Sequence, residues 1–107
     1  MARRLLMGED MSAVKIPTLH LNGTSGEVLR DQWTAAHKAV CDAIAAVCEA
    51  GPNARDYYVQ GPDAALAAQR EHEARVKALR QVRDEIFQIA DAIDAQLLDR
   101  ELARSGK

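Results

Sequence analysis

A stretch of about forty residues, from about 63 to 103, contains neither glycine nor proline. Apolar residues recur through its second half at steps of three and four, which is the spacing of a helix that packs along one side. They are Val76, Leu79, Val82, Ile86, Ile89, Ile93 and Leu97. At 1.5 Å per residue such a helix reaches about 60 Å. The sequence therefore predicts one long helix, which needs other segments to cover its apolar side.

A second, shorter helix is predicted from about 27 to 50. Thr24 stands three residues before Glu27, the spacing of a capping box. Gly51-Pro52 is the expected order at a helix end, with a glycine in the left-handed conformation before a residue that cannot continue. Two apolar lines recur at helical spacing between these ends: Leu29, Trp33, Ala36, Val40, Ala43 and Val47, and His37, Cys41, Ile44 and Cys48. Two lines imply two neighbours, one of which could come from another chain.

The two helices and their connection at 51–62 predict an all-α fold, an antiparallel helical hairpin with one shorter and one long helix. We expect a single domain over 16–104, in which an extended N-terminal arm starts at Ile16 and packs on the helices. Residues 1–15 are expected to form a mobile tail, with Met11 as an alternative start. Aromatic residues make up only 4% of the 107-residue chain, and alanine buries little area. The thin core predicts self-association into an oligomeric helical bundle, and Arg83 near an inner position disfavours a long parallel coiled coil.

The overall charge excludes some classes of partner. Fourteen basic and sixteen acidic residues give a formal net charge of −2, which lacks the single-sign field that duplex DNA binding uses. The apolar run near the N-terminus is too short for a signal peptide or a membrane span, so we expect a cytoplasmic protein. Cys41 and Cys48 lie about 10 Å apart along one helix and are expected to be small core residues. His37 and Cys41 could share a metal, but no paired ligand motif supports one, and no cofactor is expected.

Polar side chains that could bind a ligand occur in two stretches. The arm carries His20, Asn22 and Thr24, and the connection carries Arg55, Asp56, Tyr57 and Tyr58. An arginine presents a fork of donors suited to phosphate, and tyrosine rings can stack on a base. Because the stretches flank opposite ends of the first helix, they can meet only if the arm folds back or if a second antiparallel copy brings the two ends together, and the latter is expected to form a site between subunits. In the alternative interpretation, Asp56 simply holds Arg55 and the tyrosines pack on the end of the hairpin.

The arm IPTLHLNGTS at 16–25 and the loop PNARDYYVQGPDA at 52–64 resemble short uncharacterised proteins of tailed bacteriophages and prophages. The resemblance covers most of the chain from Ile16 to about Ile93. Size and layout are also similar to the phage proteins called sponges, which are oligomers that sequester cyclic nucleotide immune signals between subunits. The resemblance implies stacking by Tyr57 or Tyr58, phosphate contact by Arg55, and hydrogen bonds from His20, Asn22 and Thr24.

These expectations favour a phage-encoded anti-defence protein that binds and sequesters a small nucleotide-type immune signal without cleaving it. The alternative is a helical interaction or assembly protein, such as a phage structural accessory or an inhibitor that docks on a host protein. An enzyme is not expected, because the sequence has no nucleophile elbow, phosphate-binding loop or zinc-protease motif. A DNA-binding regulator is disfavoured because no basic recognition helix is evident.

Overall fold

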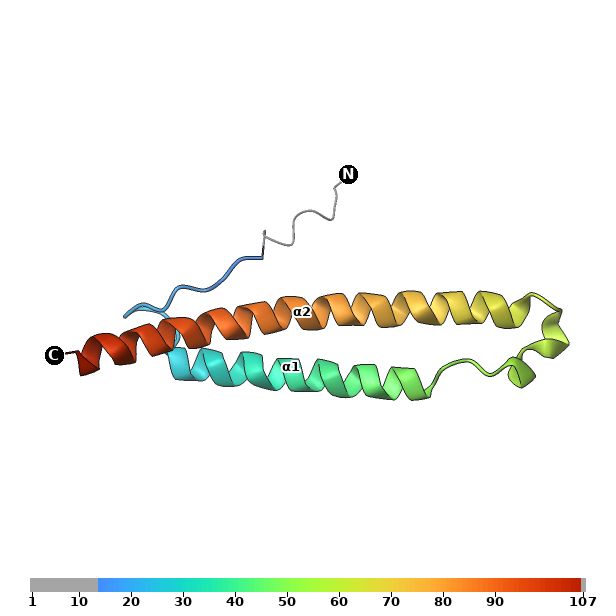
Figure 1. Cartoon of the computed structure of the whole chain (residues 1–107), viewed down its shortest axis with the longest axis horizontal. Coiled ribbons are helices and arrows are strands. Elements are labelled where there is room, and N and C mark those ends of the chain that lie inside the picture. Colours follow the sequence, from blue (N-terminus) through green and yellow to red (C-terminus); the bar gives the residue numbers. More distant parts are fainter. Residues whose placement is uncertain (1–13, 107) are drawn as a thin grey trace. The chain divides into compact units, whose positions relative to one another are not determined.

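The computed structural model describes residues 14–106 of the chain, and in this part helices are the only regular elements (Figure 1). Helix α1 spans Gly26–Glu49 and helix α2 spans Ala64–Ser105. Two short 3-10 helices lie between them, η2 (Ala54–Asp56) and η3 (Tyr58–Gln60), which the sequence analysis did not predict. The all-helical class with one shorter and one long helix is thus confirmed for the described residues. Both α-helices begin and end within one or two residues of the predicted positions.

The chain divides into two compact units. Unit 1 combines residues 14–37 with residues 84–106, and unit 2 is Lys38–Arg83. The predicted single domain over 16–104 and its assembly into an oligomer stay predictions. Residues 1–13 of the predicted tail, with the alternative start at Met11, lie outside the described residues.

In unit 1, the first half of α1 packs antiparallel against the last part of α2. A Cβ atom placed on Gly26, in the first turn of α1, would lie 2.6 Å from the Cδ2 atom of Leu97. Farther along α1, the ring centroid of His37 lies 5.6 Å from that of Phe87. Residue numbers therefore rise along α1 as they fall along α2. Ile93 is fully buried in this unit.

The N-terminal arm is the third segment of unit 1, and Gln96 of α2 holds it through two hydrogen bonds. The Leu19 N–H donates to Oε1 of Gln96 at 2.9 Å, and Nε2 of Gln96 donates to the Pro17 carbonyl at 2.8 Å. The Leu19 side chain also approaches Gly26, where an added Cβ would lie 2.8 Å from the Leu19 Cδ1. The prediction that the arm packs on the helices is confirmed at Pro17 and Leu19.

The ends of α1 differ from their predicted chemistry. The cap is Ser25, whose hydroxyl accepts a hydrogen bond from the Val28 N–H at 3.2 Å, so the predicted cap at Thr24 is wrong by one residue. The predicted left-handed Gly51 is also wrong, because Gly61, with a φ of 121°, is the positive-φ glycine of the described chain. Helix α1 instead ends in a tightened turn, in which the Ala50 N–H donates to two successive carbonyls.

The inner side of α2 follows a strict alternation of three and four residues. The buried and half-buried positions on this line are Val76, Leu79, Arg83, Ile86, Ala90, Ile93 and Leu97. The predicted inner residue Val82 is instead 45% exposed, because the regular alternation selects its neighbour Arg83. In unit 2 the buried core residues are Ile44 and Val76. Cys48 is exposed rather than part of a core.

Candidate functional site

The predicted ligand residues of the connection lie in and beside the two 3-10 helices of unit 2. Oδ1 of Asn53 accepts from the Arg55 N–H at 3.1 Å and so starts η2. Arg55 and Asp56 are both exposed, and within residues 14–106 no ion pair joins their side chains. Tyr58 is 72% exposed, whereas Tyr57 is half-buried. The alternative in which Asp56 holds Arg55 is therefore not observed.

The predicted arm residues His20, Asn22 and Thr24 are exposed and belong to unit 1. They surround a turn in which the Gly23 N–H donates to the His20 carbonyl at 3.1 Å. The His20 ring folds over Gly23, since a Cβ there would meet its Nε2 atom at 2.8 Å. His20 thus has a local role in closing the turn. Because the arm and loop residues belong to different units, their joint site between subunits stays a prediction.

A depression of about 560 Å³ lies in unit 2, between the end of α1 and the first turns of α2. This volume falls within the range of about 300–1,000 Å³ typical of small-molecule sites. It is lined by Cys48, Gly51, Gln69, His72, Glu73, Val76, Lys77 and Arg80. The absent side chain at Gly51 contributes to the opening, because a Cβ there would lie 3.5 Å from Nε2 of His72. The depression combines an apolar floor at Val76 with polar and charged walls.

The charges of this depression are not neutralised internally. Nε2 of Gln69 donates to Oε2 of Glu73 at 3.3 Å. Lys77 follows Glu73 by four residues but forms no ion pair with it, although Arg75, at the same spacing after Glu71, pairs with that residue at 3.6 Å. Within the described chain, neither Lys77 nor Arg80 has an ion-pair partner. Two cationic side chains against one carboxylate give the lining a net charge of +1, which favours an anionic ligand.

These lining residues were not predicted to bind a ligand, although their spacing in the sequence contains a signal that they lie together. Positions 69, 72, 73, 76, 77 and 80 recur at helical spacing, and so they share one side of α2. In the sequence this pattern is the same as that of a solvated helix surface with i,i+4 ion pairs. Only the hydrogen bond between Gln69 and Glu73 and the open position at Gly51 distinguish this depression from such a solvated helix surface.

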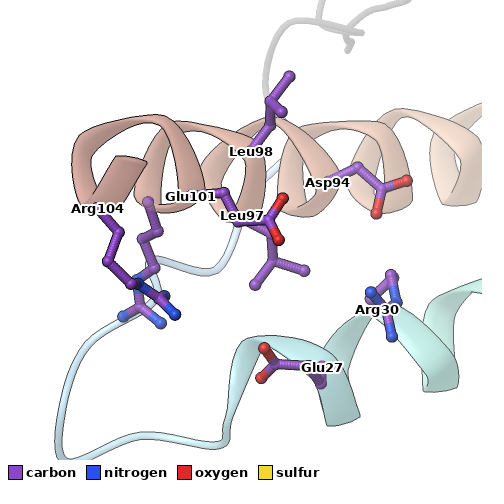
Figure 2. A pocket seen from close by; sticks show the side chains of 8 residues that line it. Glu27, Arg30, Asp94, Leu97, Leu98, Glu101 and Arg104 are labelled. Carbon is purple, nitrogen blue, oxygen red and sulfur yellow. The ribbon is translucent and has the colours of Figure 1, made fainter. Parts of the chain in front are cut away.

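A second depression, of about 380 Å³, lies in unit 1 and is strongly charged. Its lining consists of Glu27, Arg30, Asp94, Leu97, Leu98, Arg100, Glu101 and Arg104. Figure 2 shows Glu27 and Arg30 on α1, facing Asp94, Glu101 and Arg104 on α2. The lining contains three cationic and three acidic side chains, so its formal net charge is zero. None of the residues that line either depression was predicted from the sequence to bind a ligand.

Other classes of site find less support in the part of the chain that the structure describes. No group of three or more histidine, cysteine or acidic side chains is arranged there to hold a metal ion. Both cysteines are free thiols. None of the helices among these residues combines the length and apolar character that a membrane span requires.

The chain was compared with known proteins at the level of families, curated sequences and solved structures. It matches no family model, and neither a curated protein nor a solved structure is significantly similar to it.

Proposed function

We propose that this chain is a non-catalytic binding protein that holds a small anionic ligand of the nucleotide type in the depression of unit 2. The observation that carries the proposal is the pair Lys77 and Arg80, which line a ligand-sized depression without carboxylate partners. The guanidinium of Arg80 suits the paired oxygens of a phosphate, and the ammonium of Lys77 supplies a point charge. The apolar surface of Val76 is suited to contact with a base or sugar.

The connection supplies further groups of the same chemistry within unit 2. Arg55 has no ion-pair partner among the described residues, and Tyr58 presents an exposed ring. Arg55 is assigned to phosphate contact and Tyr57 or Tyr58 to stacking, with hydrogen bonds from the arm residues of a second copy. In this proposal the protein sequesters a nucleotide immune signal without cleaving it. Its role would be anti-defence in the cytoplasm of a phage-infected host, as the resemblance to phage proteins implies.

The test is thermal unfolding of the purified protein against a panel of cyclic dinucleotides, cyclic trinucleotides and linear nucleotides. A ligand at a hundredfold excess over its dissociation constant stabilises the folded state by about 2.7 kcal/mol. We expect this gain with one nucleotide class for the wild type, and its loss in the double variant Lys77→Gln/Arg80→Gln. Arg75→Gln is the matched control, because Arg75 lies on the same helix but is paired with Glu71.

Two results would contradict the proposal. One is the absence of stabilisation by any nucleotide in the panel, and the other is an equal shift in the wild type and the double variant. Recovery of the nucleotide intact after incubation is expected, since the proposal is sequestration. The variant Arg55→Ala then tests whether the connection contributes to binding as well as Lys77 and Arg80. Retained nucleotide binding in this variant would restrict the site to the depression.

The second candidate is a helical interaction protein, either a phage structural accessory or an inhibitor of a host protein. Large apolar side chains of α2 that remain exposed favour it, among them Leu66, Phe87, Leu98 and Leu102. Such a surface marks protein interaction sites when its members are contiguous. Capture from host lysate of one stoichiometric protein by the wild type, but not by Phe87→Glu, together with no nucleotide stabilisation, would favour this candidate.

A further inference from the structure

The charged depression of unit 1 carries cations and anions that do not neutralise each other within the chain. Of its three arginines, Arg30 has a close carboxylate in Asp31, at 3.2 Å, which is not part of the lining. Arg100 and Arg104 have no ion-pair partner among the described residues, nor does Glu101. These groups line one hollow (Figure 2), and Arg100, Glu101 and Arg104 still have their ion-pairing capacity available.

Exposed leucines lie beside these charges. Leu98 is 55% exposed and Leu102, one turn later on α2, is 61% exposed. A further depression of about 440 Å³ is lined by both leucines and shares Glu101 and Arg104 with the first. The two depressions therefore form one continuous surface around the end of α2. Exposed leucines bordered by charged groups are typical of the centre and rim of a protein interface.

The order of the charges along α2 selects the kind of partner. Of the lining residues on α2, Asp94 precedes Leu98, whereas Arg100, Glu101 and Arg104, with a net charge of +1, follow it. With a two-fold axis beside Leu98, the α2 helices of two copies lie antiparallel. The basic end of each helix, with Arg100 and Arg104, then faces Asp94 of the other copy. An interface of this symmetry must be self-complementary. Because the lining contains cations and carboxylates in equal numbers, a second copy of the same surface offers a partner for each sign, whereas a ligand of one sign would meet groups of both signs.

We propose that this surface is an interface between two copies of the chain, with Leu98 and Leu102 at its centre and reciprocal ion pairs at its rim. The inference goes beyond the ligand site, because it concerns unit 1 and does not need a nucleotide. Like charges opposed across an interface disfavour association, whereas complementary charges set the choice of partner.

Charge reversal tests the interface directly. The basic-end variant is Arg100→Glu/Arg104→Glu, and the acidic variant is Asp94→Lys. By light scattering after size exclusion, we expect the wild type to have at least twice the 11.7 kDa mass of the single chain. Each reversed variant alone should associate about tenfold or more weakly, and an equimolar mixture of the two should regain the assembled mass. Wild-type mass in both separate variants, or a monomeric wild type, would overturn the proposal.

Two additional measurements keep the outcomes distinct. If a reversed variant loses its helical circular dichroism, Leu98→Gln/Leu102→Gln replaces it, since both leucines are exposed and the proposal predicts a lower mass there too. Lys77→Gln/Arg80→Gln should keep the assembled mass, because those residues line the other depression. If a nucleotide still stabilises a dissociated variant against thermal unfolding, ligand binding does not depend on self-association. Each of the two proposals is then accepted or rejected by its own experiment.

Discussion

Units 1 and 2 are built from parts of the same two helices, but they differ in how completely they bury their apolar side chains. Unit 1 buries Ile93 completely, with Ala90 beside it on α2 and Gly26 from the start of α1. Unit 2 buries Ile44 and Val76, each of which retains a small exposed area. Unit 1 has a third segment, the arm, whereas unit 2 has the connection with its two 3-10 helices. Among the described residues, unit 1 therefore encloses one side chain completely, whereas no side chain of unit 2 is fully enclosed.

The difference separates the residues that stabilise the fold from those available for binding. The arm contributes Leu19 and the two hydrogen bonds to Gln96, so unit 1 has packed apolar contacts that substitutions would disrupt. Lys77 and Arg80 of unit 2, by contrast, are exposed and form no ion pair with another described residue. Substitutions in unit 1 should therefore lower stability, and substitutions of Lys77 and Arg80 should change binding alone. Four predictions test this difference between the units.

The largest effect is expected for Ile93→Ala. Truncation of a fully buried isoleucine removes transfer free energy and leaves a cavity, and should lower the free energy of unfolding by about 3–4 kcal/mol. The matched change in unit 2, Ile44→Ala, should cost about 2 kcal/mol, because Ile44 is less completely enclosed. Urea denaturation of both variants measures the difference. An equal or larger loss for Ile44→Ala would reverse the comparison.

The two glycines that end or begin helical packing provide the next contrast. In Gly26→Ala the new methyl group meets Leu97 and Leu19 at 2.6 and 2.8 Å, so both side chains must move. Overpacking should outweigh the helix-propensity gain and cost about 1 kcal/mol. Gly51→Ala in unit 2 has a nearest neighbour at 3.2 Å and no positive φ, and should change stability by less than about 0.5 kcal/mol. Stabilisation by Gly26→Ala would show that the arm is not packed there.

The arm contact gives a smaller and more local effect. Gln96→Ala removes both hydrogen bonds to the arm and should cost about 1–2 kcal/mol, since each is worth about 1 kcal/mol. Hydrogen exchange at the Leu19 amide should become faster while exchange within unit 2 stays unchanged. Gln88→Ala is the control, because Gln88 lies exposed on the same helix. Unchanged protection of Leu19 would mean that Gln96 does not hold the arm.

The smallest effect concerns an exposed pair in unit 2. The hydrogen bond from Lys38 to Asp42, and then their charge attraction, raise the pKa of Lys38 above its ordinary value of 10.5. A raised pKa stabilises the fold below pH 10.5, and the contribution disappears as the pH rises through the folded-state value. The difference in urea midpoint between wild type and Asp42→Asn should be slight near pH 8 and should vanish as the pH rises through the folded-state pKa of Lys38. A difference that grows above pH 10.5 would contradict this account.

Much of the fold could be predicted from the sequence because long helical periods are local signals. The absence of glycine and proline within α2, and the Gly51-Pro52 pair after α1, placed both helices within a residue or two. The exact inner positions were harder to predict, since Val82 and Arg83 are neighbours and only the packed structure decides between them. The choice of Ser25 over Thr24 as the cap likewise depends on how the arm enters the helix.

The candidate site was predictable only in its chemistry. The loop residues Arg55 and Tyr58 are exposed, and Arg55 forms no ion pair with another described residue, but their role in binding stays a prediction. The depression itself depends on where the end of α1 lies against His72 and on the bond between Gln69 and Glu73. Neither is visible in a sequence, because i,i+4 spacing allows Glu73 to choose either Gln69 or Lys77 as its partner.

The location of the ligand site is tested most directly by a nucleotide titration followed in amide NMR spectra of the wild-type protein, with the nucleotide that gives the largest thermal shift. We expect the largest chemical-shift changes at residues 69–80 and at Cys48 and Gly51, with smaller changes in the connection. Saturating nucleotide that perturbs chiefly unit 1, or that leaves residues 69–80 unchanged, would contradict the assignment of the ligand site to unit 2.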